Sequence, residues 1–210
     1  MFKHEFIEIG GVKWATMNIG ASSVTDYGLY FQWGDIKGYT QKQVNDGDKP
    51  FGWGDYKFLH SVNNGVNGPN YGFTKYNITD GLKVLEPFDD AAHMAWLGGW
   101  RMPTAEEFQS LGNATTSVWT SDYQGSGVKG LVCTDKTDSS KVLFFPACGY
   151  CALGGMYAVG YFGCYWSSSL GSVGVAQYAR NLRCLSGCVN WNVNCNRCCG
   201  FPVRAVLADI

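Results

Sequence analysis

The last third of this chain of 210 residues has a composition that restricts the folds it can adopt. After Lys141 the sequence contains no lysine and no glutamate, and its only charged residues are four arginines and Asp209. Only 16% of all residues are charged, whereas 15% are aromatic and 28 are glycine. This combination favours a loop-rich fold that contains β-strands over a helical bundle. The two parts of the chain were therefore shaped under different constraints.

The cysteines are also concentrated in the last third, which holds eight of the nine. An odd count argues against a complete set of internal disulfides, and adjacent cysteines such as Cys198 and Cys199 rarely bond to each other. The spacing of Cys195, Cys198 and Cys199 leaves a zinc site as an alternative. A paired CxxC…CxxC arrangement is missing, however, and no histidine follows His93. Buried, unreactive thiols are a further alternative.

Charge and hydropathy exclude several classes of protein. The formal net charge is −1, so no global charge points to nucleic acid or to an anionic membrane. No apolar run reaches the length of about 20 residues that spans a membrane. The first residues lack the apolar stretch of a secretory signal, so we expect a protein that is not exported by this route, or one whose signal has been removed. We expect no nucleic-acid partner, no membrane span and no cofactor.

Short apolar or alternating runs predict strands after the first glycines and in the second half of the chain. The predicted strands are 12–17, which follows a hairpin-like opening, and 118–121, 130–134, 141–145, 165–168, 177–182 and 201–207. Residues 36–80 are rich in Gly, Asn, Asp and Lys, which predicts long loops. The triplet Trp-Gly-Asp occurs in them at 53–55 and just before them at 33–35, but the surroundings differ, so we infer no structural repeat.

Two helices are predicted in the middle of the chain. The first covers 87–97, where Asp89 and Asp90 suit the positive N-terminal end and Gly98-Gly99 would end the helix. The second begins at Thr104, which forms a capping box with Glu107. With no linker in sight, the sequence predicts one α+β domain over 1–210, with mixed short strands, two helices and long loops.

A series of motifs covers nearly the whole chain in order. They are 14–20 (WATMNIG), 26–28 (DYG), 33–35 (WGD), 75–77 (KYN), 89–92 (DDAA), 100–104 (WRMPT) with Glu107-Phe108, 165–169 (YWSSS) and 200–204 (GFPVR). This series resembles the Fibrobacter succinogenes major paralogous domain, and the piece from Trp100 to Phe108 is the most specific. The resemblance implies a C-type-lectin-like fold of the branch related to formylglycine-generating enzymes.

The tail is similar to the variable proteins of diversity-generating retroelements. In such systems a reverse transcriptase miscopies adenines, and asparagine codons of the AAC type change most. Their products include Tyr, Cys, Ser, Gly, Val, Leu, Arg and Phe, but not Lys, Glu, Gln, Met or Trp. Between Arg183 and Cys199 the asparagines at 190, 192, 194 and 196 look like unmutated codons. Of the other residues only Trp191 falls outside this set, and a scaffold position would explain it. Upstream, Met156 and Gln177 are not among the reachable residues. The exact start of the variable stretch therefore stays open, and we place it at about residue 148.

The resemblance implies a ligand-binding protein whose variable region, about 148–199, lies on loops held by a rigid sheet. Its tyrosines would provide contact area and its arginines charged contacts, as in antibody paratopes. The candidate ligand-binding residues are Tyr157, Tyr161, Cys164, Tyr178, Arg180, Arg183, Cys184, Leu185, Cys188, Trp191, Val193, Cys195, Cys198 and Cys199. The expected partner is a clone-specific protein or surface receptor, and a phage particle or a bacterial surface is the favoured location.

Other functions stay open as alternatives. One is an interaction domain of the same family that is not diversified. Another is a copper- or zinc-dependent enzyme like those that generate formylglycine, with Cys195 and Cys199 as the imagined pair, although the long motifs around such cysteines are not evident. Asp35 and Asp55 could be calcium ligands, but aspartates in glycine turns more often shape the turn. We see no Ser-His-Asp set and no phosphate loop, and we expect no enzyme.

Overall fold

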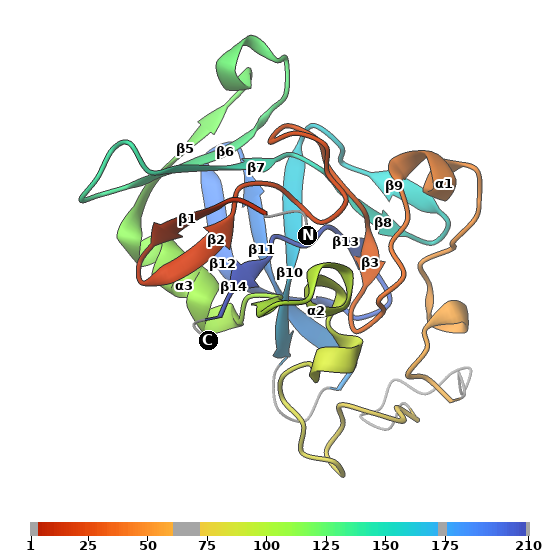
Figure 1. Cartoon of the computed structure of the whole chain (residues 1–210). Coiled ribbons are helices and arrows are strands. Elements are labelled where there is room, and N and C mark those ends of the chain that lie inside the picture. Colours follow the sequence, from red (N-terminus) through yellow and green to blue (C-terminus); the bar gives the residue numbers. More distant parts are fainter. Residues whose placement is uncertain (1–3, 61–71, 172–175, 209–210) are drawn as a thin grey trace.

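The computed structural model describes residues 4–60, 72–171 and 176–208. These residues form four antiparallel sheets and three α-helices (Figure 1), an α+β architecture. The helices are α1 (Gln41–Asn45), α2 (Ala91–Trp96) and α3 (Ala105–Ala114). The strands are β1 (Phe6–Ile9), β2 (Val12–Ala15), β3 (Phe31–Gln32), β4 (Trp100–Arg101), β5 (Thr115–Thr120), β6 (Gly130–Asp135), β7 (Val142–Pro146), β8 (Tyr150–Ala152), β9 (Gly155–Tyr157), β10 (Phe162–Leu170), β11 (Tyr178–Leu185), β12 (Cys188–Asn196), β13 (Gly200–Phe201) and β14 (Val206–Leu207).

One sheet brings together the two ends of the described chain. Its strand order is β1-β2-β14-β4, and β1 and β2 form the predicted opening hairpin. Arg204, which is fully buried just before β14, donates to the carbonyl oxygens of Ala15 (3.3 Å) and Phe144 (2.9 Å) and to Asn18 Oδ1 (2.9 Å). The buried guanidinium therefore ties the C-terminal segment to the N-terminal sheet and to β7.

The prediction of one strand over 201–207 is wrong, because the segment divides into β13 and β14. Pro202 has no N–H to donate to a ladder. The carbonyl oxygens between the two strands accept from separate parts of the chain: that of Pro202 from Trp166 N, and that of Val203 from Ile19 N. The segment passes from the sheet β3-β13-β8-β9 to the sheet β1-β2-β14-β4, so neither sheet can hold all of it.

The second predicted helix is confirmed. In α3 the Thr104 side chain accepts from Glu107 N, and the Glu107 side chain accepts from Thr104 N, which completes the capping box. Glu107 also pairs with Arg101, with 2.5 Å between Arg101 Nη2 and Glu107 Oε1, in a partly exposed ion pair. The helix continues through Gly112 to Ala114.

The first predicted helix is shorter than expected. Pro87–Asp89 form a 3₁₀ turn, and α2 begins only at Ala91. Asp90 is the N-cap and accepts from Ala92 N and His93 N. The Asp89 carboxylate instead binds Lys57 Nζ (2.8 Å), Lys75 Nζ (2.5 Å) and Tyr76 Oη (2.7 Å), so it stabilises the loops rather than the helix end.

The expectation of two helices omitted α1, which lies in the predicted loop region 36–80. Thr40 and Gln43 form its capping box, a pattern that the sequence contains but that five helical residues do not make conspicuous. Residues 61–71 of this region lie outside the described residues. The two Trp-Gly-Asp triplets differ, as expected: Trp53–Asp55 form a 3₁₀ turn, whereas the other triplet follows β3.

Two clusters of buried side chains form the core, and β10 contributes to both. Trp166 belongs to the first cluster, with Trp33 and Phe201. Tyr165, the preceding residue, belongs to the second, with Phe108 of α3. The indole N–H of Trp166 donates to Phe31 O (2.9 Å) and that of Trp33 to Ser167 O (2.8 Å), so β3 and β10 are joined in both directions.

The sheet β10-β11-β12 occupies the centre of the molecule behind β2 and β14 (Figure 1). Strands β10 and β11 confirm the predicted strands 165–168 and 177–182, and β5, β6 and β7 confirm the three after Gly112. Strand β12 was not predicted, because its asparagines at 190, 192, 194 and 196 are unfavourable in strands. Residues 172–175, between β10 and β11, lie outside the described residues.

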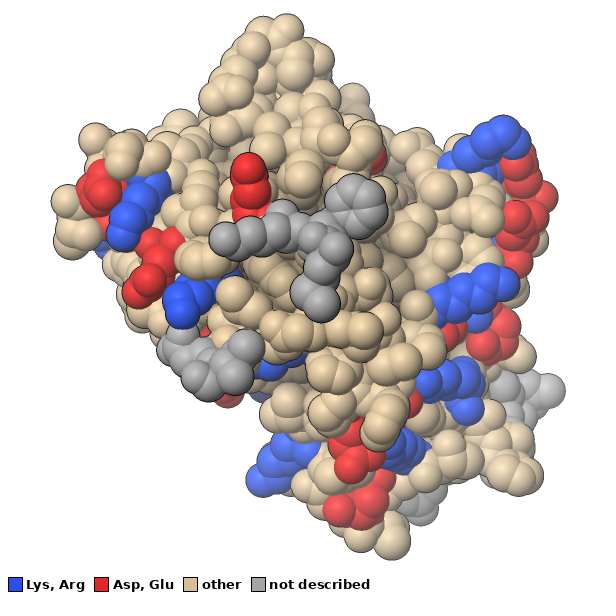
Figure 2. Space-filling view, in the orientation of Figure 1, with Lys and Arg blue, Asp and Glu red and all other residues tan. Residues whose placement is uncertain are grey.

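Charged side chains gather at the left and right margins and in the lower part of the face in Figure 2, where opposite charges lie side by side. Asp35 and Asp55 both have a cationic partner within the chain. Lys49 Nζ lies 2.8 Å from Asp55 Oδ2 and 3.8 Å from Asp35 Oδ2. The two aspartates thus share an ammonium group of the chain.

Candidate binding surface

The two faces of the sheet β10-β11-β12 follow from its register, because paired residues project to the same face and successive residues alternate. The Arg183 face is defined by four rows: Phe162–Leu185–Cys188, Cys164–Arg183–Asn190, Trp166–Asn181–Val193 and Ala179–Cys195. The opposite side, the Arg180 face, carries from β11 the side chains of Tyr178, Arg180, Leu182 and Cys184.

Each face is buried along only half of its length. On the Arg183 face, Ala179 and Asn181 are buried, whereas Arg183 and Leu185 are partly exposed. On the Arg180 face the order is reversed, because Leu182 and Cys184 are fully buried. The open half of the Arg183 face is the part of the sheet that a ligand can reach from this side.

A surface of aromatic, aliphatic and small polar side chains covers this open half and continues along β12 to Val193 and Cys195, which are partly exposed although their partners Asn181 and Ala179 are buried. We call it the Arg183 patch. It comprises Tyr150, Tyr157, Phe162, Arg183, Leu185, Cys188, Asn190, Val193 and Cys195, all partly or fully exposed. Its centre lies on paired strands that meet in the two-residue turn Ser186–Gly187, where Gly187 adopts φ +78°. A patch on paired strands is pre-organised, so a ligand does not have to order it on binding.

The tyrosines of the patch come from the hairpin β8–β9. Tyr150 and Tyr157 are direct cross-strand partners, and their rings stack with centroids 5.4 Å apart. Burial and the neighbouring thiols of Cys164 and Cys199 raise the pKa of Tyr150, while Arg183 opposes this shift. The bridge between Gly149 and Gly163 places Tyr150 beside β10. Tyr157 is 43% exposed.

Arg183 is the only charged residue of the patch. It lies between Cys164 of β10 and Asn190 of β12, and it lowers the pKa of the Cys164 thiol against the larger, raising effect of burial. Its Nε atom is buried and has no hydrogen-bond partner among the described residues. None of the ion pairs formed by residues 4–60, 72–171 and 176–208 includes Arg183.

The structure brings together in the patch six of the residues expected to bind ligand: Tyr157, Arg183, Leu185, Cys188, Val193 and Cys195. They come from three strands, β9, β11 and β12. The variable residues were expected on loops, and this expectation is wrong for the five that belong to β11 and β12. Arg183, Leu185, Cys188, Val193 and Cys195 lie within these strands.

Four of the expected residues lie in the core and are removed from the candidate surface. Cys164 is 1%, Cys184 0%, Cys198 5% and Cys199 9% exposed. Cys184 projects to the buried half of the Arg180 face, and the other three belong to the first core cluster. Composition marked these positions as changeable, but it contains no information on the face to which each one points.

Three expected residues, Tyr178, Arg180 and Trp191, lie on the Arg180 face instead. A β-bulge places both Trp191 and Asn192 opposite Leu182. The indole packs against α3 at Gly112, where a β-carbon would lie only 2.5 Å from Trp191 Nε1. Trp191 is thus a scaffold residue, and the missing side chain of Gly112 makes room for it.

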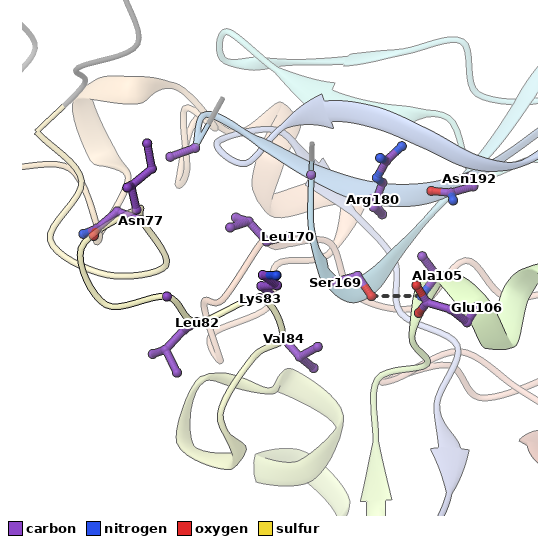
Figure 3. Close-up of a pocket in the computed structure, with 14 residues that line it drawn as sticks. Asn77, Leu82, Lys83, Val84, Ala105, Glu106, Ser169, Leu170, Arg180 and Asn192 are labelled. Atoms are coloured by element: carbon purple, nitrogen blue, oxygen red, sulfur yellow. Dashed lines mark hydrogen bonds between the residues drawn. The ribbon is translucent and has the colours of Figure 1, made fainter. Parts of the chain in front are cut away.

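The open half of the Arg180 face borders a cavity of about 540 Å³ (Figure 3). Its walls are the segment 77–84, the end of β10, the start of α3, and Arg180 with Asn192 from the sheet. Ser169 Oγ accepts a hydrogen bond from Ala105 N (3.0 Å) and closes one side. Asn192 Oδ1 is buried without a hydrogen-bond partner among the described residues.

Tyr161 belongs to neither face. It is 69% exposed in the segment between β9 and β10, and Lys129 Nζ lies 5.4 Å from its ring centroid. Tyr161 is therefore exposed, as expected for a contact residue. Its contact with Lys129, which directly precedes β6, places it next to the sheet β5-β6-β7 and not on the sheet β10-β11-β12.

All nine cysteines are free thiols. Burial raises the pKa of Cys133, Cys148 and Cys164 to about 12 in each case. The pKa of Cys195 is also raised, mainly by a hydrogen bond with Cys199 and next by burial. Such thiols stay protonated at neutral pH, whereas nucleophilic or metal-binding cysteines are thiolates. Among the described residues no three His, Cys, Asp or Glu side chains are grouped so as to hold a metal ion.

Three residues of the patch were not predicted: Tyr150, Phe162 and Asn190. Asn190 could have been found, since it belongs to the alternating asparagines of the tail, and alternate residues share a face once the segment is taken as a strand. Tyr150 and Phe162 had no such signal, because their place depends on the bridge between Gly149 and Gly163 that sets β8 beside β10.

The chain was compared with family models, curated proteins and solved structures, and none of them matches it. Within the described residues, no helix is both long and apolar enough to cross a membrane.

Proposed function

We propose that this chain is a binding protein with a C-type-lectin-like fold, and that its Arg183 patch recognises a clone-specific protein or surface receptor. The proposed role is recognition rather than catalysis. We further propose that a retroelement diversifies the patch through adenine-directed mutagenesis. The fold assignment is supported by the ordered motifs and by the mixed sheets with an N-terminal hairpin that pairs with the last strand.

One observation carries the proposal: expected variable positions from β9, β11 and β12 converge on a single open surface. Tyrosine offers a large contact area with little loss of entropy, and small polar residues adapt their hydrogen bonds. The patch has both kinds, with Tyr150 and Tyr157 at one side and Asn190 near the centre. A pre-organised strand scaffold allows such side chains to change without loss of the fold.

The experiment that tests this function is to sequence the gene and its flanking DNA in several isolates. We expect an imperfect repeat of the tail, a reverse transcriptase gene, and differences between isolates at Arg183, Leu185, Cys188 and Asn190. Buried Leu182 and the packed Trp191 should stay constant, because changes there would disturb the core. The same tail in every isolate, with no repeat, would instead favour an interaction domain that is not diversified.

A second candidate function is the binding of a small molecule in the cavity of the Arg180 face. Its volume of about 540 Å³ lies within the range of ligand sites. The buried Asn192 Oδ1 lacks a donor, which a ligand N–H or O–H could supply. A fragment screen followed by methyl NMR of Val84 and Leu170 tests this function, and unchanged methyl signals throughout the screen would remove it.

A further inference from the structure

The Arg183 patch has a charge that the chain itself does not neutralise. Its other members are aromatic, aliphatic, thiol or amide side chains, and Arg183 is its one ionised group. We infer that the ligand of this patch is a protein segment that presents an aspartate or glutamate carboxylate among apolar side chains. The inference rests on the proposed function and specifies the chemistry of the partner.

Arg183 has no carboxylate partner among the described residues, and its neighbour in β10 is the Cys164 thiol. Between Lys141 and Asp209 the sequence has no acidic residue. Arg101 pairs with Glu107, and Arg204 donates to backbone carbonyls and to Asn18 Oδ1. Arg197 donates to Tyr76 O, and although its Nε and Nη2 atoms also lack an acceptor, it is fully buried in the core, where no ligand reaches it. Arg183 has a buried Nε without an acceptor, although it lies on the surface where a partner is expected to bind.

Covering the charge of Arg183 with a partner has a cost in free energy. In the unbound protein, water solvates the exposed part of the guanidinium. A partner that covers the patch removes this water, and an arginine buried without an acceptor then strongly destabilises the complex. A carboxylate avoids this loss, because it accepts two parallel hydrogen bonds from a guanidinium. The ligand must therefore provide an acceptor opposite Arg183.

The surroundings of Arg183 do not suit other anionic partners. A single cation is too little for nucleic acid, whose affinity comes from many phosphate contacts. A membrane surface likewise needs several basic residues. The side chains around Arg183, namely Phe162, Leu185 and the stacked pair Tyr150–Tyr157, supply apolar and aromatic area of the kind that protein interfaces bury around an arginine.

Asn190 adds a second polar contact next to the charge. It is the direct cross-strand partner of Arg183 and is exposed. Its amide group can donate to a carboxylate oxygen that the guanidinium leaves unused. An amide group of the ligand, in contrast, would turn at least part of its N–H edge toward Arg183, where both groups are donors. The pair thus favours a carboxylate over its isosteric amide.

The test uses the whole chain and a phage-displayed library of disulfide-constrained random peptides as the probe. Peptides are selected on the wild-type protein, and each is then measured against Arg183→Gln, Arg183→Lys and the control Tyr178→Ala, which alters the opposite face. We expect selected peptides to share an acidic residue next to apolar residues. Their Kd should rise at least about 10-fold with Arg183→Gln, less with Arg183→Lys, and not with Tyr178→Ala.

A double-mutant cycle separates the pair from its surroundings. Replacing the peptide's acid by its amide should weaken binding to the wild type but not to Arg183→Gln. Peptides that lose binding with Leu185→Ala, yet lack an acid and tolerate Arg183→Gln, would overturn the inference and leave the proposed function standing. If no selected peptide responds to any patch substitution, the proposed function fails as well. Thermal melting of each variant verifies that it is folded.

Discussion

The Arg183 face and the Arg180 face belong to the same three strands but have opposite roles at the same height of the sheet. Where the Arg183 face is open, around Arg183 and Leu185, the Arg180 face is closed by Leu182 and Cys184. Neighbouring residues of β11 therefore alternate between surface and core. A surface that varies on such a sheet can change only every second residue without disturbing the interior.

Two arginines of the tail, Arg183 and Arg197, differ in the same way in their burial. Arg183 is a partly exposed group of the patch, whereas Arg197 is 0% exposed although it lies in the same compositionally unusual tail. Arg197 donates to Tyr76 O (3.0 Å), and its guanidinium carbon lies 4.0 Å from the Phe73 ring centroid. Burial lowers the pKa of Arg197, and the aromatic rings around it compensate for part of the lost hydration.

The largest expected effect is therefore the difference between Arg197→Ala and Arg183→Ala. Arg197→Ala leaves a void and an unsatisfied carbonyl, and we expect it to lower the free energy of unfolding by about 3 kcal/mol. Arg183→Ala should lower it by less than about 1 kcal/mol. Urea denaturation measures both values. Equal losses would mean that Arg183 also belongs to the core, and the proposed patch would lose its centre.

The next effect compares two cysteines that lie four residues apart. Cys184 is fully buried, with Sγ so close to Gly163 that a β-carbon there would lie 2.7 Å away, whereas Cys188 is exposed. Cys184→Asn places a larger amide in the core and should destabilise the protein by about 2–4 kcal/mol. Cys188→Asn should change the stability by no more than about 0.5 kcal/mol.

Thermal denaturation of the two variants measures this difference, with Cys188→Ser as a control for loss of the thiol alone. Tolerance of asparagine at both positions would contradict the separation of the two faces. It would also return Cys184 to the set of positions that a retroelement could vary.

Much of the fold was predictable from local signals. The capping box of Thr104 and Glu107 located α3, and alternating apolar runs located β5, β6 and β7. Strand β12 was not predictable in this way, because its asparagines disfavour a strand. Its pairing with β11 and the packing of Trp191 on α3 outweigh this preference, and both are long-range contacts.

The candidate site was predictable in composition but not in geometry. The scarcity of charge and the set of residue types marked the tail as unusual, and six of the expected residues lie in the patch. The same signals also selected Cys164, Cys184, Cys198 and Cys199, which are core residues. The side of the sheet to which a residue points depends on register, and register depends on pairing across many residues of the chain.

A smaller effect tests the packing of the Arg180 face. Alanine is favoured over glycine in a helix by about 1 kcal/mol, yet Gly112→Ala should destabilise the protein by about 1–2 kcal/mol because the new β-carbon overlaps the Trp191 indole. With Trp191→Leu in place, the same change should become neutral or stabilising. Chemical denaturation of the four members of this cycle measures the coupling, and additive effects would show that α3 and β12 do not pack in this way.

The smallest expected effect is a difference in the rate of thiol labelling between cysteines on the two faces. It is measured on the folded protein and does not depend on a change in stability. Labelling by a thiol reagent needs an accessible thiolate. Cys188 is exposed, whereas Cys164 and Cys184 are buried and have raised pKa values, so they can react only after the sheet opens. The hydrogen bond with Cys199 and burial also keep Cys195 protonated. The folded protein should therefore show a fast phase that arises from Cys188 and disappears in Cys188→Ser.

Mass spectrometry of the labelled protein identifies the cysteine behind each phase, and labelling in denaturant provides the reference in which all nine thiols react. Modification of Cys184 as fast as that of Cys188 would mean that the closed half of the Arg180 face opens readily. The open half of the Arg183 face would then no longer be special as the accessible side of the sheet. Slow modification of Cys184, at the rate of global unfolding, would identify it as part of the most stable region of the fold.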